Sequence, residues 1–215
     1  MNLKTKTPIF LENEKRFLYD TAFVKERIAE ALINWLPDEP KEYIIVCIGT
    51  DRSTGDALGP LTGSLLNKRK YNHFTVFGTL ERPVHATNLT DTITFINQTY
   101  TNPFIIAVDA CLGRKSSVGS IIVGTGSIQP GAALQKELPA VGDLYLNGVV
   151  NVSGYMDYMV LQSTRLHIVM NMAEVLAGSL HYLDTYLTYP SAKRMKKETG
   201  INYSFNQKKS TSESN

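Results

Sequence analysis

Two short apolar runs, YIIVCIGT at residues 43–50 and PFIIAVDA at residues 103–110, constrain the fold of this chain more than any other feature. Neither run alternates apolar with polar residues, as a strand with one solvated face does. Both runs therefore predict strands that are covered on both faces, which is typical of parallel sheets enclosed by helices. A chain that contains them must supply helices to cover the two faces of its sheet.

The residues between and after these runs supply such helices. Helical spacing of apolar residues at 57–70 and at 88–100 predicts two crossover helices, with a strand at 73–80 between them. Further strands are predicted at 119–126 and 142–152, and the first of these follows its predecessor too closely for a helical crossover, so it should run antiparallel to a neighbour. This order of elements predicts a three-layer α/β/α sandwich with a mostly parallel, mixed central sheet of about five strands.

Two more helices and a tail complete the predicted organisation. One amphipathic helix is predicted within residues 12–36 and a long helix at 155–187, each packed against the sheet. Residues 1–190 are predicted to form a single domain, because a chain of 215 residues is long enough for one full core. Residues 191–215 are basic and polar, with few apolar side chains, and are predicted to be a flexible tail.

Composition narrows the classes of function. A net charge of +2 implies no strong bulk attraction to nucleic acid or to a membrane surface. No run approaches the ~18 apolar residues of a membrane span, and the N-terminus lacks the apolar region of a signal peptide. Cys47 and Cys111 lie in or just after apolar runs without CxxC spacing, which is typical of a reducing compartment. We therefore expect a cytoplasmic protein with no membrane partner and no direct nucleic-acid partner.

Asp56 and Asp109 are the candidate catalytic residues. Asp56 follows the first apolar run, in the glycine-rich loop GTDRSTGDALG, and Asp109 ends the second run. Both are thus expected at the carboxyl ends of parallel strands, where ligands bind in open α/β sheets. Each also has a purely structural alternative, because Asp56 could cap the helix that begins near Ala57 and Asp109 could form a turn.

Two arrangements of these carboxylates lead to different chemistry. Within hydrogen-bonding distance they would share a proton and provide one acid and one base for the attack of water on a carbonyl group. With a histidine between them they could instead bind a metal. The loop has neither the GK[ST] of a P-loop nor a GxGxxG pattern, so nucleotide binding is disfavoured. Cys111 is a weaker candidate nucleophile, because no histidine is placed by the sequence to activate it.

Four further residues are predicted to bind substrate. Asp51 and Gly55 belong to the same loop as Asp56, and His85 follows the strand at 73–80, at the same end of the sheet. The irregular segment 125–143 is long enough to form one wall of a cleft, and its Lys136 offers a positive charge to a substrate. No metal ligand and no cofactor are predicted.

Three motifs, IGTDRSTGDALGP, IIAVDACLG and GTGSIQPGAALQKELPAVGD, together resemble the YyaC group of sporulation proteins over roughly residues 40–185. More distantly, they resemble the germination protease that degrades small acid-soluble spore proteins. That resemblance implies an aspartate-dependent peptidase whose two essential aspartates match Asp56 and Asp109. The implied fold is phosphorylase/hydrolase-like and similar to that of the hydrogenase-maturation endopeptidases, which recognise nickel through two acidic residues and a histidine. No histidine of this chain aligns with that third ligand.

The residues and the resemblance together predict a sporulation-associated peptidase that hydrolyses peptide bonds through its aspartate pair. The resemblance implies a small acid-soluble spore protein, or another unstructured spore protein, as substrate, in the forespore or mother cell of a spore-forming bacterium. The sequence is compatible with a homo-oligomer. Two alternatives stay open: a metal-dependent maturation-type endopeptidase with His85 as its third ligand, and a catalytically inactive sporulation factor that retains the protease fold.

Overall fold

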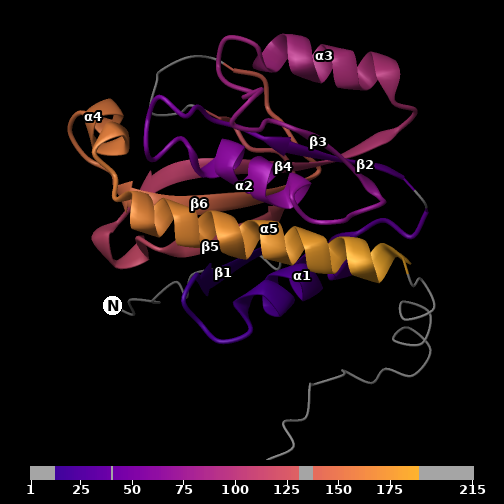
Figure 1. The fold of residues 1–215 in the computed structure, drawn as a ribbon, viewed down its shortest axis with the longest axis horizontal. Helices are drawn as coiled ribbons and strands as arrows, with labels where there is room; N and C mark the ends of the chain where they lie inside the picture. The colour runs from indigo at the N-terminus through magenta and orange to yellow at the C-terminus, as the bar shows by residue number, and fades with distance from the viewer. Residues whose placement is uncertain (1–12, 40, 131–137, 189–215) are drawn as a thin grey trace, which may run out of the picture.

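A computed structural model describes residues 13–39, 41–130 and 138–188. Its central sheet has the strand order β1-β5-β6-β4-β2-β3 (Figure 1). The strands are β1 (Glu14–Leu18), β2 (Glu42–Cys47), β3 (Phe74–Phe77), β4 (Pro103–Gly113), β5 (Ser120–Thr125) and β6 (Leu144–Val152). Every strand but β5 runs in the same direction, so the sheet is mixed and mostly parallel, as predicted.

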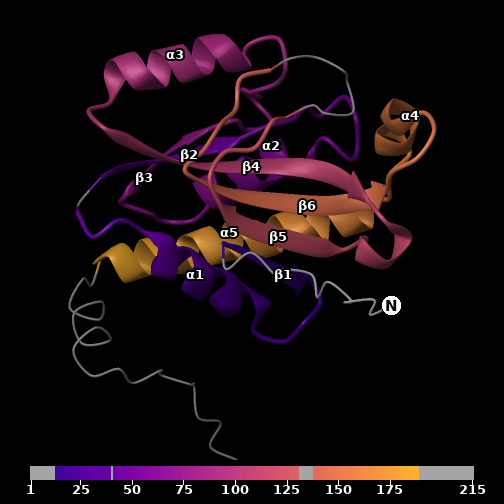
Figure 2. The same ribbon diagram turned by 180° about the vertical axis from the view of Figure 1, so that it is seen from behind.

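Helices cover both faces of the sheet. They are α1 (Val24–Trp35), α2 (Leu58–Asn67), α3 (Leu89–Thr99), α4 (Asp157–Gln162) and α5 (Leu166–Thr188), with a short 3₁₀ turn at Lys115–Ser117. Helices α1, α2 and α5 pack on one face of the sheet, and α3 lies on the other (Figures 1 and 2). The predicted three-layer α/β/α sandwich is confirmed. None of the described helices is long and apolar enough to cross a membrane.

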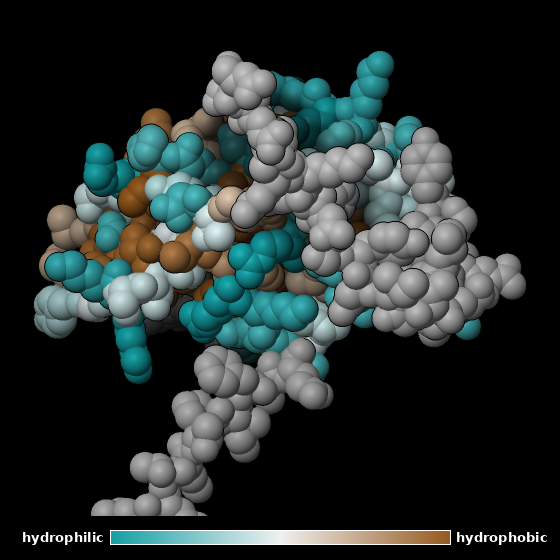
Figure 3. Space-filling view, turned by 90° about the horizontal axis from the view of Figure 1, so that it is seen from below, coloured by the Kyte–Doolittle hydropathy of each residue, from teal (hydrophilic) through white to brown (hydrophobic). Residues whose placement is uncertain are grey.

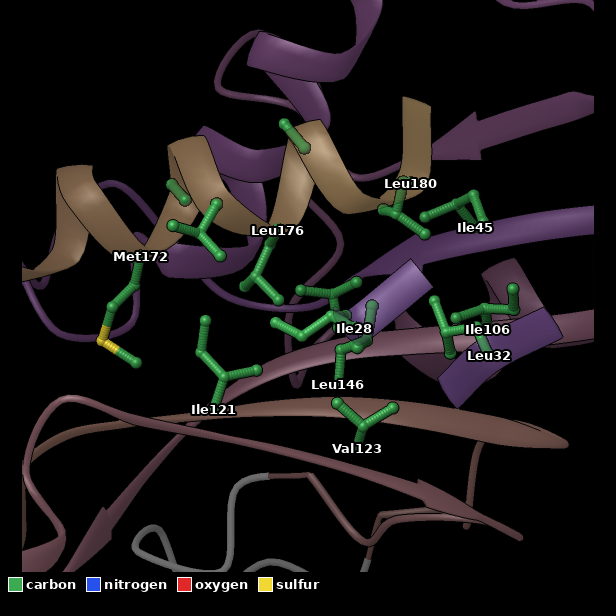
Figure 4. Packing of buried hydrophobic residues seen from close by; sticks show 14 of the residues in the cluster. Ile28, Leu32, Ile45, Ile106, Ile121, Val123, Leu146, Met172, Leu176 and Leu180 are labelled. Atoms are coloured by element: carbon green, nitrogen blue, oxygen red, sulfur yellow. The ribbon is translucent and has the colours of Figure 1, made fainter. Parts of the chain in front are cut away.

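The strands send alternate side chains to the two faces, which explains their continuous apolar runs. Ile45 and Leu146 pack in the larger core with Leu176 and Leu180 of α5 (Figure 4). Ile44, next to Ile45 on β2, belongs to the smaller core under α3. Each fully buried Leu or Ile stabilises the fold by about 1.5–3 kcal/mol.

The helix predicted within residues 12–36 is wrong in its first part. Residues Glu14–Leu18 form β1, which pairs antiparallel with β5 and is the sixth strand of the sheet. Of this strand only Phe17 is buried, and the helical spacing of apolar residues begins only at Val24, so the predicted helix was extended too far toward the N-terminus. The helix itself starts at Val24, after Phe23 takes a left-handed conformation with φ 58°.

The long helix predicted at 155–187 is interrupted between α4 and α5. The Ser163 hydroxyl donates a hydrogen bond to the Met159 carbonyl (2.8 Å), and the Thr164 hydroxyl donates to the Val160 carbonyl (2.8 Å). Such side-chain bonds compete with the continuation of a helix. α4 therefore stands apart from the sheet at the carboxyl end of β6 (Figure 1). The predicted tail, residues 191–215, lies outside the described residues.

Candidate active site

The carboxyl ends of β2 and β4 are the switch point of this sheet. β2 leads through α2 to β3 on one side, whereas the chain after β4 leads to β5 and β6 on the other. The two connections diverge, and ligands of open α/β sheets bind outside the strand ends at such a point. The segment that follows β2 and the second half of β4 both lie at this point.

Asp109 lies inside a strand rather than at its end, which corrects the predicted strand limit. β4 continues to Gly113, whereas its pairing with β2 stops at Val108, opposite Cys47. From Asp109 onward, β4 therefore pairs with β6 on one side and no longer pairs with β2 on the other. The backbone stays extended because β6 continues to pair with it, so the turn alternative for Asp109 is wrong.

A tight loop after β2 positions Asp56. Gly49 has φ 143°, and its N–H donates to the Val84 carbonyl (2.8 Å), while the Thr50 N–H donates to the Asp56 carbonyl (3.1 Å). A Cβ at position 49 would lie 1.9 Å from that same carbonyl oxygen, so only glycine fits there. The N-cap of α2 is Ala57, and no side chain caps the helix, so the capping alternative for Asp56 is wrong.

The two aspartates are electrostatically coupled. Burial raises the pKa of Asp109 to about 8, the Ala110 N–H opposes this by donating to Asp109 Oδ1 (2.8 Å), and the charge of Asp56 raises the pKa further. Burial also raises the pKa of Asp56. Of the two carboxyls, Asp109 is thus the one whose pKa is raised to about 8 by its surroundings.

The other residues of the glycine-rich loop differ in exposure. Gly55 is buried, its N–H donates to the Leu161 carbonyl (2.9 Å), and an added Cβ would meet Leu161 at 2.8 Å and the Thr164 hydroxyl at 3.1 Å. This glycine therefore attaches the loop to α4 and presents no surface to a substrate. Asp51 is exposed in the same loop, so it is accessible to a ligand, and its role in substrate binding stays a prediction.

The predicted binding roles of His85 and Lys136 stay predictions as well. His85 follows Val84, which bridges to Ile48 beside the loop. Its ring Nδ1 lies 2.9 Å from the Thr87 hydroxyl, and it lines a surface hollow of about 650 Å³. No described group of three or more His, Cys, Asp or Glu side chains is placed to hold a metal ion, His85 included. Lys136 lies outside the described residues.

Asn147 was missed by the sequence reasoning. It stands opposite Asp109 in the parallel register of β4 and β6, and its Oδ1 is buried with no hydrogen-bond partner among the described residues. The signal was available, because a polar amide interrupts the mostly apolar run LYLNGVV within the strand predicted at 142–152.

Ser53 was missed too. It is only 5% exposed and lies close enough to Asp56 to lower the pKa of that carboxyl, although the two side chains form no hydrogen bond of ordinary geometry. A serine in a glycine-rich loop gives no such signal in sequence, because serine is common in turns for other reasons.

The Cys111 thiol is a poor nucleophile at neutral pH. Burial, followed by the charge of Asp109, raises its pKa to about 11. Only the thiolate attacks a carbonyl group, so this side chain stays in its unreactive form. The structure thus argues against cysteine chemistry at the site.

An exposed apolar surface flanks the site. It belongs to the segment 152–166 around α4. The Leu161 carbonyl of this segment accepts a hydrogen bond from the Gly55 N–H in the loop that carries Asp56. Its exposed members are Val152, Tyr155, Met156, Tyr158, Met159 and Leu166. Tyr158 and Leu166 fall within the helix predicted at 155–187, which was expected to pack against the sheet. Hydrophobic surface also gathers toward the left of the view from below (Figure 3).

The fold and the site define an α/β sandwich with a coupled aspartate pair at its switch point. The chain belongs to the family described as "Protein of unknown function (DUF1256)", whose model matches residues 16–179. It is 59% identical over 144 residues, 67% of this chain and 70% of the relative, to "Uncharacterized protein YyaC" of Bacillus subtilis (strain 168), which confirms the predicted YyaC-type resemblance.

A solved structure to which the chain is similar is the crystal structure of a [NiFe] hydrogenase maturation protease HycI from Thermococcus kodakarensis KOD1. The two chains are 15% identical and superpose with a TM-score of 0.46, covering 69% of this chain and 95% of that one.

Proposed function

We propose that this protein is a peptidase that hydrolyses peptide bonds of unstructured proteins through Asp56 and Asp109. One observation carries the proposal: burial and the charge of Asp56 hold a proton on Asp109 at neutral pH. A protonated carboxyl coupled to a second carboxyl is the arrangement that supplies an acid and a base to one reaction. No cofactor is needed for this chemistry.

The proposed reaction uses each carboxyl once. Ionised Asp56 takes a proton from water, and the water oxygen attacks the carbonyl carbon of the scissile bond. Asp109 donates its proton to the amide nitrogen as the C–N bond breaks, which leaves a free carboxyl group and a free amine. Transfer of the proton from Asp56 back to Asp109 restores the pair.

Small acid-soluble spore proteins are the proposed substrates. The motif resemblance to the germination protease supports this class. The exposed apolar segment 152–166 beside the site supports an unfolded chain as substrate, because such a chain presents apolar side chains to a complementary surface. We place the protein in the cytoplasm of the forespore or mother cell.

The proposal predicts that Asp56→Asn lowers cleavage of a purified small acid-soluble spore protein by about 10³-fold or more, because the general base is removed. Cleavage products are measured by mass spectrometry, with and without a chelator, and the chelator is expected to change nothing. Asp91→Asn is a matched control, because Asp91 is an exposed aspartate in the first turn of α3.

Two results would contradict the proposal. Folded wild-type protein that binds the spore protein without cleaving it would favour the inactive sporulation factor. Cleavage that disappears with chelator and returns with nickel or zinc would favour the metal-dependent endopeptidase instead.

The pH dependence of cleavage gives a separate prediction. We expect kcat/KM to fall as the pH rises through about 8, because Asp109 then loses the proton that it donates. We expect a second fall at acid pH, where Asp56 becomes protonated. Initial rates between pH 4 and pH 10 test both limbs, and a rate that still rises above pH 9 would exclude Asp109 as the acid.

A further inference from the structure

Asn147 lies directly beside Asp109 and points to the same face of the sheet. β4 and β6 run side by side in parallel (Figure 2), with these two residues opposite each other in the register. Two positions earlier on each strand, Ala107 and Tyr145 belong to the core on the α3 face. Because side chains alternate along a strand, the carboxyl of Asp109 and the carboxamide of Asn147 share that face.

The carboxamide oxygen of Asn147 has an unused hydrogen-bonding position. No described residue bonds to this buried atom, and leaving such a group unpaired destabilises a folded protein. By contrast, the side chain of Asn151 on the same strand has hydrogen-bond partners for both its nitrogen and its oxygen. Its Nδ2 donates to the Val160 carbonyl (3.3 Å) and the Thr164 hydroxyl (3.2 Å), and its Oδ1 accepts from the Val152 N–H (2.8 Å).

A second buried polar atom without a partner lies at the other carboxyl. Ser53 lies in the same loop as Asp56, and its Oγ makes no hydrogen bond of ordinary geometry within the described part of the chain. The two unpartnered atoms come from different elements, the loop after β2 and the middle of β6. They therefore flank the aspartate pair, with Ser53 at Asp56 and Asn147 at Asp109.

We infer that Asn147 and Ser53 bind backbone peptide groups of the substrate on either side of the scissile bond, an inference that rests on the proposed function. A peptide group offers one N–H donor and one carbonyl acceptor, and a carboxamide or a hydroxyl can pair with either. Recognition of the backbone requires no particular substrate side chain. The site thus takes extended peptide segments as a class. Asn147 and Ser53 do not determine which peptide bond of the substrate is cleaved.

Asn147→Leu tests this inference, because leucine has a similar size and forms no hydrogen bond. Measured by calorimetry in an Asp56→Asn background, which does not cleave, the Kd for the small acid-soluble spore protein is expected to rise about 10-fold. With Asp56 intact, kcat/KM should fall by the same factor. The Tm should not fall, because the substitution removes a buried group that had no partner.

Asn151→Leu is the matched control. It removes the hydrogen bonds that join β6 to α4, so the Tm should fall. A Tm that falls as much in Asn147→Leu as in Asn151→Leu would show a structural role for Asn147 and overturn the inference.

Unchanged Kd and kcat/KM in Asn147→Leu would overturn the inference alone, provided that wild type cleaves. Wild type that neither binds nor cleaves the spore protein would overturn the proposed function, and this inference with it.

Discussion

Asp109→Asn is expected to abolish peptide cleavage and, at pH 8, to raise the free energy of unfolding. Cleavage stops because asparagine cannot donate the proton that the leaving amine requires. Stability rises because the substitution replaces a carboxyl that ionises reluctantly when buried with a neutral group of the same shape. A gain in stability together with a loss of activity is a recognised signature of a strained functional site.

The sign of the pH effect follows from the raised pKa of Asp109, about 8 when folded and close to 4 when unfolded. Between these values the unfolded chain has lost the proton and the folded chain keeps it. Folded wild type therefore loses up to about 1.4 kcal/mol of stability per pH unit as the pH rises through this window. The Asp109→Asn variant does not undergo this loss, so the difference in free energy of unfolding between variant and wild type grows from near zero at pH 4 to roughly 3 kcal/mol at pH 8. This value is about half of what the full pKa shift would give, because the Asp109 side chain is only half-buried and solvent screens its charge.

Urea unfolding at pH 4, 6 and 8 measures this difference. Asp184→Asn provides the contrast, because Asp184 is more fully buried than Asp109 and its carboxylate accepts backbone N–H groups from Asn72 (3.0 Å) and His73 (2.8 Å). That variant should lose stability, since bonds to an ionised acceptor are weakened. A loss of stability at pH 8 in Asp109→Asn would show that Asp109 is ionised and satisfied in the folded protein, contrary to the assignment as an acid.

Gly59→Ala is expected to destabilise the protein by about 3 kcal/mol or more. A Cβ at position 59 would lie 2.1 Å from the Ile48 carbonyl oxygen and 2.7 Å from the Ile48 nitrogen. Both are backbone atoms, so no side chain can move aside. The first turn of α2 would have to lift from the end of β2, and Asp56, which precedes it, would move away from Asp109.

Thermal and urea unfolding measure the cost, and Gly154→Ala is the control. A Cβ at Gly154 meets no atom within 4 Å, so this variant should unfold like wild type. If Gly59→Ala unfolds like Gly154→Ala, then α2 does not need its close approach to β2. The contact between Gly59 and Ile48 would then not be what holds Asp56 in position.

Local patterns predicted most of the strands and helices because each is encoded by a short stretch of residues. The apolar runs at β2 and β4 identified buried strands, and helical spacing identified α2 and α3. β1 was missed because its pairing partners lie about a hundred residues away, on β5. The break between α4 and α5 was missed because hydroxyl groups that bond back to helix carbonyls leave the apolar spacing unchanged.

The sequence by itself determined that Asp56 and Asp109 belong to segments bordering the same end of a parallel sheet, because an unbroken apolar run requires a strand buried on both faces. Only the tertiary structure decided that the two carboxyls are coupled and that Asp109 keeps a proton at neutral pH. It also decided that Asn147, not a histidine, stands beside Asp109. Burial and strand register arise from contacts between distant parts of the chain. No local residue pattern encodes the pairing of β4 with β6 or the low dielectric around a carboxyl group.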